Sequence, residues 1–67
     1  MKMEELKEVK LPIDLKSENG RIITVFRKVE TNIGEYFQVV MKDSPYPFLL
    51  SENEMFALLQ GYPEVVK

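Results

Sequence analysis

The sequence predicts an α+β fold, in which an antiparallel sheet of three to four strands is followed by one C-terminal helix packed on one face. Up to residue 50 the chain alternates apolar and polar side chains between glycine-containing turns, which is typical of strands. Residues 51–61 then combine a capping signal with the apolar spacing of a helix. We therefore expect the element order β-β-β-β-α.

The start of the helix is the most specific local signal. Ser51 is a good N-cap, and Glu54 stands three residues later, as a capping box requires. Leu50 before the cap can contact Met55 in the first turn as a hydrophobic staple. The helix is therefore expected to begin directly after the last strand.

The end of the helix and its buried side are also marked. Met55, Leu58 and Leu59 have the i, i+3, i+4 spacing of a stripe that faces a core. Gly61 is expected to supply a left-handed residue that ends the helix, and Pro63 prevents its continuation. These residues predict a helix that covers one face of the sheet.

Length and composition limit the possible functions. The chain has 67 residues, with no cysteine and no histidine, so we expect one domain over residues 9–67 after a flexible arm over residues 1–8. A core this small is marginal, and a homodimer would remedy it. The sequence predicts no enzyme, no cofactor and no metal site. No apolar run is long enough to span a membrane and no signal peptide is recognisable, so a cytoplasmic location is expected.

Strands are expected over residues 9–16, 21–30 and 35–42, with a short fourth strand over residues 47–50. Pro12 lacks an N–H group, so the first strand should lie at an edge or carry a bulge. Three-residue loops at 18–20 and 32–34 keep apolar side chains on one face, whereas a two-residue loop at Asn19-Gly20 would exchange the faces. The expected pairs are Leu15–Ile23, Ile13–Val25, Val29–Phe37 and Val25–Met41.

This register predicts two different faces. The face under the helix holds Val9, Leu11, Ile13, Leu15, Ile23, Val25, Val29, Phe37, Val39 and Met41, with Arg27 as its only charged member. The opposite face holds Lys10, Pro12, Asp14, Lys16, Thr24, Phe26, Lys28, Glu30, Tyr36, Gln38, Val40 and Lys42.

Aromatic rings alternate with lysines on the second face, as in proteins that bind single-stranded nucleic acid. Stacking side chains and phosphate-neutralising cations are both present. The predicted binding residues are Lys10, Phe26, Lys28, Tyr36, Gln38 and Lys42. The net charge of the chain is −2, but residues 9–42 carry six basic and four acidic side chains, so the acids gather elsewhere.

The order of elements and the motif Leu50-Ser51-x-x-Glu54-Met55-x-x-Leu58 resemble the positive-cofactor-four family. The resemblance implies a dimeric domain that binds single-stranded DNA in transcription or replication. That family often has tryptophan where Met55 stands. It also tends to have a basic, glycine-containing segment before the motif, whereas here residues 44–47 contain neither a base nor a glycine.

Another function remains open on the same residues. Exposed apolar side chains mark interfaces of many kinds, so the second face could instead meet a protein. In that case Phe26, Tyr36 and Tyr46 would be the anchors of a small protein-interaction or regulatory adaptor module.

Overall fold

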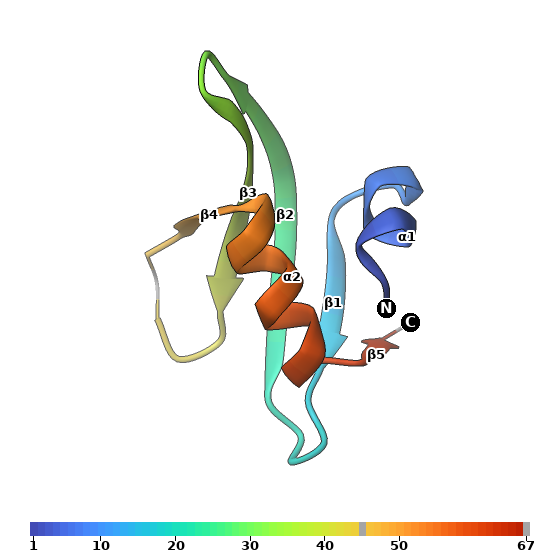
Figure 1. Cartoon of the computed structure of the whole chain (residues 1–67). Helices are drawn as coiled ribbons and strands as arrows, with labels where there is room; N and C mark the ends of the chain where they lie inside the picture. Colours follow the sequence, from blue (N-terminus) through green and yellow to red (C-terminus); the bar gives the residue numbers. More distant parts are fainter. Residues whose placement is uncertain (45, 67) are drawn as a thin grey trace.

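The computed structural model describes residues 1–44 and 46–66 as one α+β domain with five antiparallel strands and two helices. The strands are β1 (Ile13–Lys16), β2 (Ile22–Thr31), β3 (Gly34–Met41), β4 (Phe48–Ser51) and β5 (Glu64–Val66). The helices are α1 (Met3–Glu8) and α2 (Glu52–Gly61). The strand order in the sheet is β4-β3-β2-β1-β5 (Figure 1). The α+β class and the antiparallel sheet are confirmed, whereas the predicted number of elements is too small.

Both helices lie on the same face of the sheet. Leu6 of α1 and Met55 and Leu59 of α2 are buried in one core with side chains from three strands. The strand members of this core are Leu15, Ile23, Val25, Phe37 and Val39. The core members of the sheet and of α2 are those that the apolar spacing indicates, and α1 is the unexpected contributor.

The prediction of a single helix is wrong because part of the N-terminal segment folds onto the core. A flexible arm was expected over residues 1–8, but Met3–Glu8 forms α1 and Leu6 is only 1% exposed. The Met1 amino group also donates a hydrogen bond to the Pro63 carbonyl oxygen at 2.9 Å. Burying Leu6 removes apolar surface from water, which offsets the entropy lost by ordering this short segment.

The start of α2 agrees with the sequence, but its end does not. The Glu54 N–H donates to Ser51 Oγ, and the Ser51 N–H donates to Glu54 Oε1 at 3.0 Å, so the capping box is formed. These hydrogen bonds with Ser51 lower the pKa of Glu54 below its ordinary value of 4.5. The helix, however, has Gly61 as its last residue, and the C-cap Tyr62 has φ −131° and ψ 70°. Pro63 disfavours a helical backbone at the residue before it, so the helix stops there without a left-handed glycine.

The first hairpin has the predicted loop. Leu15 pairs with Ile23 and Ile13 with Val25, and the loop over residues 18–20 ends at Gly20, whose φ is +88°. The strand itself is shorter than expected, because β1 begins after Pro12. It is also not an edge strand, since β5 pairs along its other side. The prediction of an edge position for the first strand is therefore wrong.

The second hairpin differs from the prediction in two linked ways. Thr31 pairs with Gly34, so the loop contains two residues, Asn32 and Ile33, rather than three. A β-bulge then lies between Val25 and Arg27. The shorter loop exchanges the faces, and the extra residue at the bulge exchanges them back nearer the core. Val25 consequently pairs with Val39 instead of Met41.

Candidate interaction surfaces

One face of the sheet is not covered by either helix, and we call it the open face. The strand register places on it the residues that alternate with the core side chains. They include Asp14, Lys16, Ile22, Thr24, Arg27, Val29, Tyr36, Gln38, Val40, Leu49, Glu64 and Val66. Phe26 occupies the bulge between the two parts of β2 and is 52% exposed.

The structure brings together only part of the predicted nucleic-acid site. Tyr36 and Gln38 lie on the open face, as expected, and Phe26 lies at the bulge. Lys10 precedes β1 and lies outside the strands. Lys42 follows β3 in a turn, where it lines a hollow of about 350 Å³.

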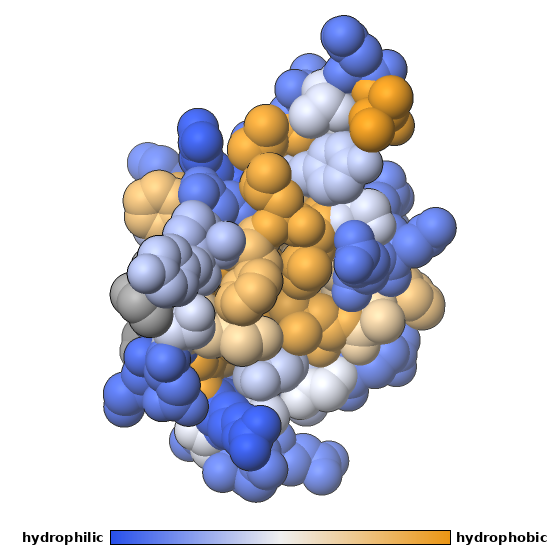
Figure 2. Space-filling model, turned by 90° about the vertical axis from the view of Figure 1, so that its left-hand side faces the viewer, coloured by the Kyte–Doolittle hydropathy of each residue, from blue (hydrophilic) through white to orange (hydrophobic). Residues whose placement is uncertain are grey.

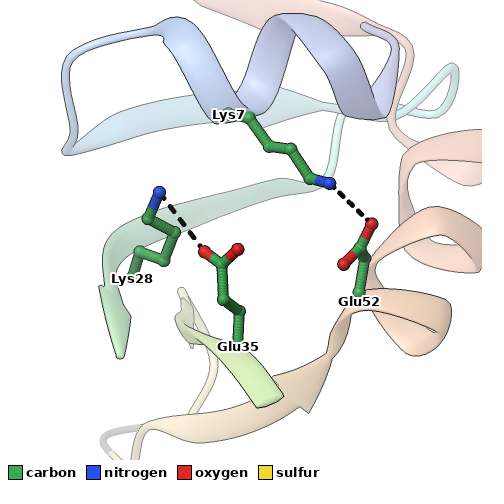
Figure 3. A network of polar contacts seen from close by, with 4 residues as sticks. All are labelled: Lys7, Lys28, Glu35 and Glu52. Atoms are coloured by element: carbon green, nitrogen blue, oxygen red, sulfur yellow. Dashed lines mark hydrogen bonds and ion pairs between the residues drawn. The ribbon is translucent and has the colours of Figure 1, made fainter. Parts of the chain in front are cut away.

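Lys28 lies on the helix side of the sheet, which contradicts its predicted position. It pairs across the ladder with the buried Phe37, and residues that pair in this way share a face. Its Nζ lies 3.3 Å from Glu35 Oε2, an ion pair whose angles do not fit a hydrogen bond (Figure 3). The bulge at Phe26 explains this position, because beyond it each residue of β2 faces the side opposite to the predicted one.

A second ion pair lies close to the first, between α1 and the start of α2. Lys7 Nζ donates a hydrogen bond to Glu52 Oε1 at 2.7 Å, and this contact raises the pKa of Lys7 above its ordinary value (Figure 3). Both side chains are exposed, so the pair contributes little stability in water. Neither Lys7 nor Lys28 adds positive charge to the open face.

The centre of the open face has the composition of a protein interface. Val29 is the partner of Tyr36 across the ladder, and Leu49 is the partner of Gln38, so apolar and aromatic groups lie side by side. Arg27 Nε donates to Gln38 Oε1 at 2.7 Å, which holds the guanidinium group beside them. Aromatic residues and arginine are enriched in protein interfaces, whereas lysine and acidic residues are depleted.

The charged residues of the open face other than Arg27 lie toward the β1–β5 side. Lys16 stands opposite Glu64 in the β1–β5 pair, so a base and an acid share one row. Asp14 accepts a hydrogen bond from Thr24 Oγ1 at 2.7 Å. Among the described residues of this face these opposite charges balance one another, and they form no cluster of cations of the kind that attracts phosphates.

A second apolar surface adjoins the β4 edge. Between β4 and α2 lies a groove of about 460 Å³. Its lining residues are Val39, Met41, Phe48, Leu50, Glu54, Ala57 and Leu58. Figure 2, which views the molecule from the side of β4, shows apolar side chains gathered in a continuous band. The sequence signal for this surface is the uncharged run Phe48-Leu49-Leu50, which gives a short strand apolar side chains on both faces.

The third anchor of the adaptor hypothesis is separate from the open face. Tyr46 is 73% exposed in the loop between β3 and β4. Pro45, in the same segment, lies outside the described residues. Tyr46 therefore stands on a loop and not on a strand of the open face.

The comparisons with known proteins find no similar protein. A scan of protein-family models finds no match, and searches of curated proteins and solved structures return no significant one.

Within residues 1–44 and 46–66, no group of acidic side chains is placed to hold a metal ion. No helix in this part of the chain is long and apolar enough to cross a membrane. The resemblance to the positive-cofactor-four family remains a prediction from the sequence.

Proposed function

We propose that this protein is a small interaction module that binds an apolar segment of another protein on its open face. The observation that carries this proposal is the position of the β2 bulge. The bulge puts Lys28 on the helix side and puts Arg27 and Val29 beside Tyr36 on the open face. A face expected to alternate aromatics with lysines is therefore apolar at its centre, with one arginine.

The chemistry of Arg27 suggests which segment binds. Its Nε–H is held by Gln38, which fixes the orientation of the guanidinium plane. The terminal N–H groups of an arginine can clamp a carboxylate in a bidentate manner, and desolvation strengthens such pairs. The partner is thus an apolar segment that carries an acidic residue opposite Arg27. Tyr36 and Phe26 supply the rigid apolar contacts that dominate protein interfaces.

Single-stranded nucleic acid is the weaker candidate for this face. The affinity of a protein for nucleic acid depends mainly on the phosphates that its basic side chains neutralise. This chain carries a net charge of −2, which disfavours such binding. Of the lysines predicted to contact phosphate, Lys28 is paired with Glu35 on the other side, and Lys10 and Lys42 lie outside the strands. Two aromatic side chains remain for stacking, without a cationic groove to follow a strand.

A selection from a random peptide library displayed on phage tests the proposal. We expect enriched peptides with apolar residues around at least one Asp or Glu. Synthetic versions should bind in a calorimetric titration, and Arg27→Ala or Phe26→Ala should weaken binding by about tenfold or more each, as interface anchors do. Ile33→Ala is the matched control, because Ile33 is 83% exposed at the tip of the hairpin, away from the centre of the face.

The same proteins should be titrated with single-stranded and duplex oligonucleotides at low salt. We expect flat signals for both. A single-strand signal that Phe26→Ala reduces, with a clear dependence on salt, would replace the protein ligand by nucleic acid. Peptides without an acidic preference, or binding that survives both alanine variants, would overturn the assignment of this face.

A further inference from the structure

β4 is an edge strand that is short and follows Pro47 directly, but its own residues are uncharged. Its outer side faces no other strand of the described chain, because the sheet order ends there. The strand is four residues long and contains neither a charged residue nor a proline. Edge strands normally carry lysines, prolines or bulges, since an open row of N–H and C=O groups attracts another strand.

The other edge of the same sheet differs in charge. β5 has three residues and begins with the charged Glu64, whereas a proline directly precedes both edge strands, Pro63 before β5 and Pro47 before β4. The short length of β5 leaves few backbone groups to pair. The apolar character of β4 is therefore a local property and not a general feature of this sheet.

We infer that β4 pairs antiparallel with β4 of a second copy of this chain, about a two-fold axis that passes beside Leu49. Antiparallel partners share a face, so an axis perpendicular to the sheet keeps both open faces on one side. The result is a continuous sheet twice as wide, with one uninterrupted open face. This inference does not rest on the proposed function, because it uses the backbone edge and side chains of β4 and the groove beside it, and not Arg27, Phe26 or Tyr36.

The helix side of β4 is self-complementary in this arrangement. With Leu49 opposite Leu49 of the second copy, Phe48 stands opposite Leu50 of that copy. Phe48 is 44% exposed and lines the groove of its own chain together with Leu50 and Leu58. Each ring then enters the groove of the other copy. An unrelated partner would need to supply such a ring, whereas a second copy has it in register.

The available area fits a weak to moderate dimer. Phe48, Leu49 and Met41 are 44%, 59% and 36% exposed, and the half-buried Leu50 and Leu58 adjoin them. A fully buried phenylalanine hides roughly 150–250 Å², so these side chains offer on the order of 300 Å² of apolar surface. A standard interface buries about 800 Å² per partner, of which a little over half is apolar. We therefore expect a dimer that forms in the micromolar range.

Sedimentation equilibrium over a range of protein concentrations, with Phe48→Lys and Val65→Lys as a matched pair, tests the inference. The two side chains are 44% and 43% exposed, and both lie on the helix side at opposite edges of the sheet. Phe48→Lys should raise the dimer dissociation constant by at least about tenfold, as loss of an interface anchor does. Val65→Lys should leave it unchanged. Circular dichroism must show both variants folded.

A second variant and a second measurement keep the inference testable if Phe48→Lys fails to fold. Ala57→Lys changes an exposed helix position on the rim of the groove and should also weaken the dimer. Amide exchange in wild-type β4 should slow as protein concentration rises, while exchange in β5 should not. A monomer at millimolar concentration, a dimer indifferent to both groove variants, or one dissociated by Val65→Lys would overturn the inference.

Discussion

The ladder between β2 and β3 has two halves that meet at the bulge, and the apolar residues of β2 lie on opposite faces of the sheet in the two halves. Near the first turn, Ile23 and Val25 face Met41 and Val39, and all of these except Met41 are buried under the helices. Beyond the bulge, Lys28 and Glu30 occupy the helix side, and Val29 lies on the open face. Two segments of one strand with similar alternation thus present opposite faces to the core.

The difference between the halves shows how a loop and a bulge act together. The two-residue loop at Asn32-Ile33 fixes the register of the outer half, where α2 covers little of the sheet (Figure 1). The inner half must bury its apolar side chains under the helices, so the strand accepts one extra residue at Phe26. The bulge reconciles the local geometry of the turn with the burial required by the core.

The largest expected difference in unfolding free energy is between alanine variants of two neighbouring residues on β3. Phe37 is 0% exposed, so Phe37→Ala should cost about 3–5 kcal/mol through lost burial and an unfilled cavity. Tyr36→Ala, on the open face, should cost about 1 kcal/mol. Urea unfolding measures both. Because the first variant could unfold outright, Phe37→Leu, with an expected cost of about 1–2 kcal/mol, keeps the comparison measurable. Equal costs at Tyr36 and at Phe37 would contradict the assigned faces.

The two turns at the ends of β2 should respond alike, and a third glycine should respond in the opposite direction. Gly20 and Gly34 have φ values of +88° and +137°, and a Cβ at either position would meet nothing within 4 Å. Alanine at either should therefore cost about 1 kcal/mol through the backbone alone. Gly61 lies in α2 without a positive φ, so Gly61→Ala should stabilise by about 0.5–1 kcal/mol. Thermal unfolding of the three variants checks the signs of these effects. If Gly61→Ala were destabilised, the prediction of a left-handed Gly61 at the end of the helix would be supported instead.

Deleting Phe26 tests whether Phe26 is the residue of β2 that has no partner on β3. Without it, Val25 opposite Val39 and Arg27 opposite Gln38 form a regular ladder with every face unchanged. We expect a change in unfolding free energy of about 1 kcal/mol or less, as for other exposed sites. Deleting Thr24 is the control, because that change forces core side chains off the core face. Similar losses from both deletions, measured by urea unfolding, would show that the extra residue lies elsewhere.

The smallest effect is expected in the outer half, at the ion pair of Lys28 and Glu35. Both side chains are about one-third exposed, so solvent screens their attraction. Lys28→Ala should cost about 0.5 kcal/mol or less, and added salt should reduce the difference from wild type further. Lys16→Ala on the open face is a suitable control. A cost comparable to that of a core substitution would mean that the outer half is packed as firmly as the inner half.

The sequence by itself determined the features that depend on neighbouring residues. The capping box of Ser51 and Glu54 and the loop that ends at Gly20 are set by contacts within a few residues, and both are confirmed. The stripe of Met55 and Leu59 is buried as its spacing predicts. Of the predicted binding residues, the sequence placed Tyr36 and Gln38 on the correct face.

Tertiary structure decided the features that depend on distant parts of the chain. α1 is ordered by burying Leu6 in a core made by the sheet and α2, and β5 exists because the chain after Pro63 returns to β1. The bulge at Phe26 arises because two registers, one set by a loop and one by the core, must meet within one strand. That bulge put Lys28 and Val29 on the faces opposite to those predicted. Local patterns specify each element, whereas the face that an element presents is fixed only when the core selects a register.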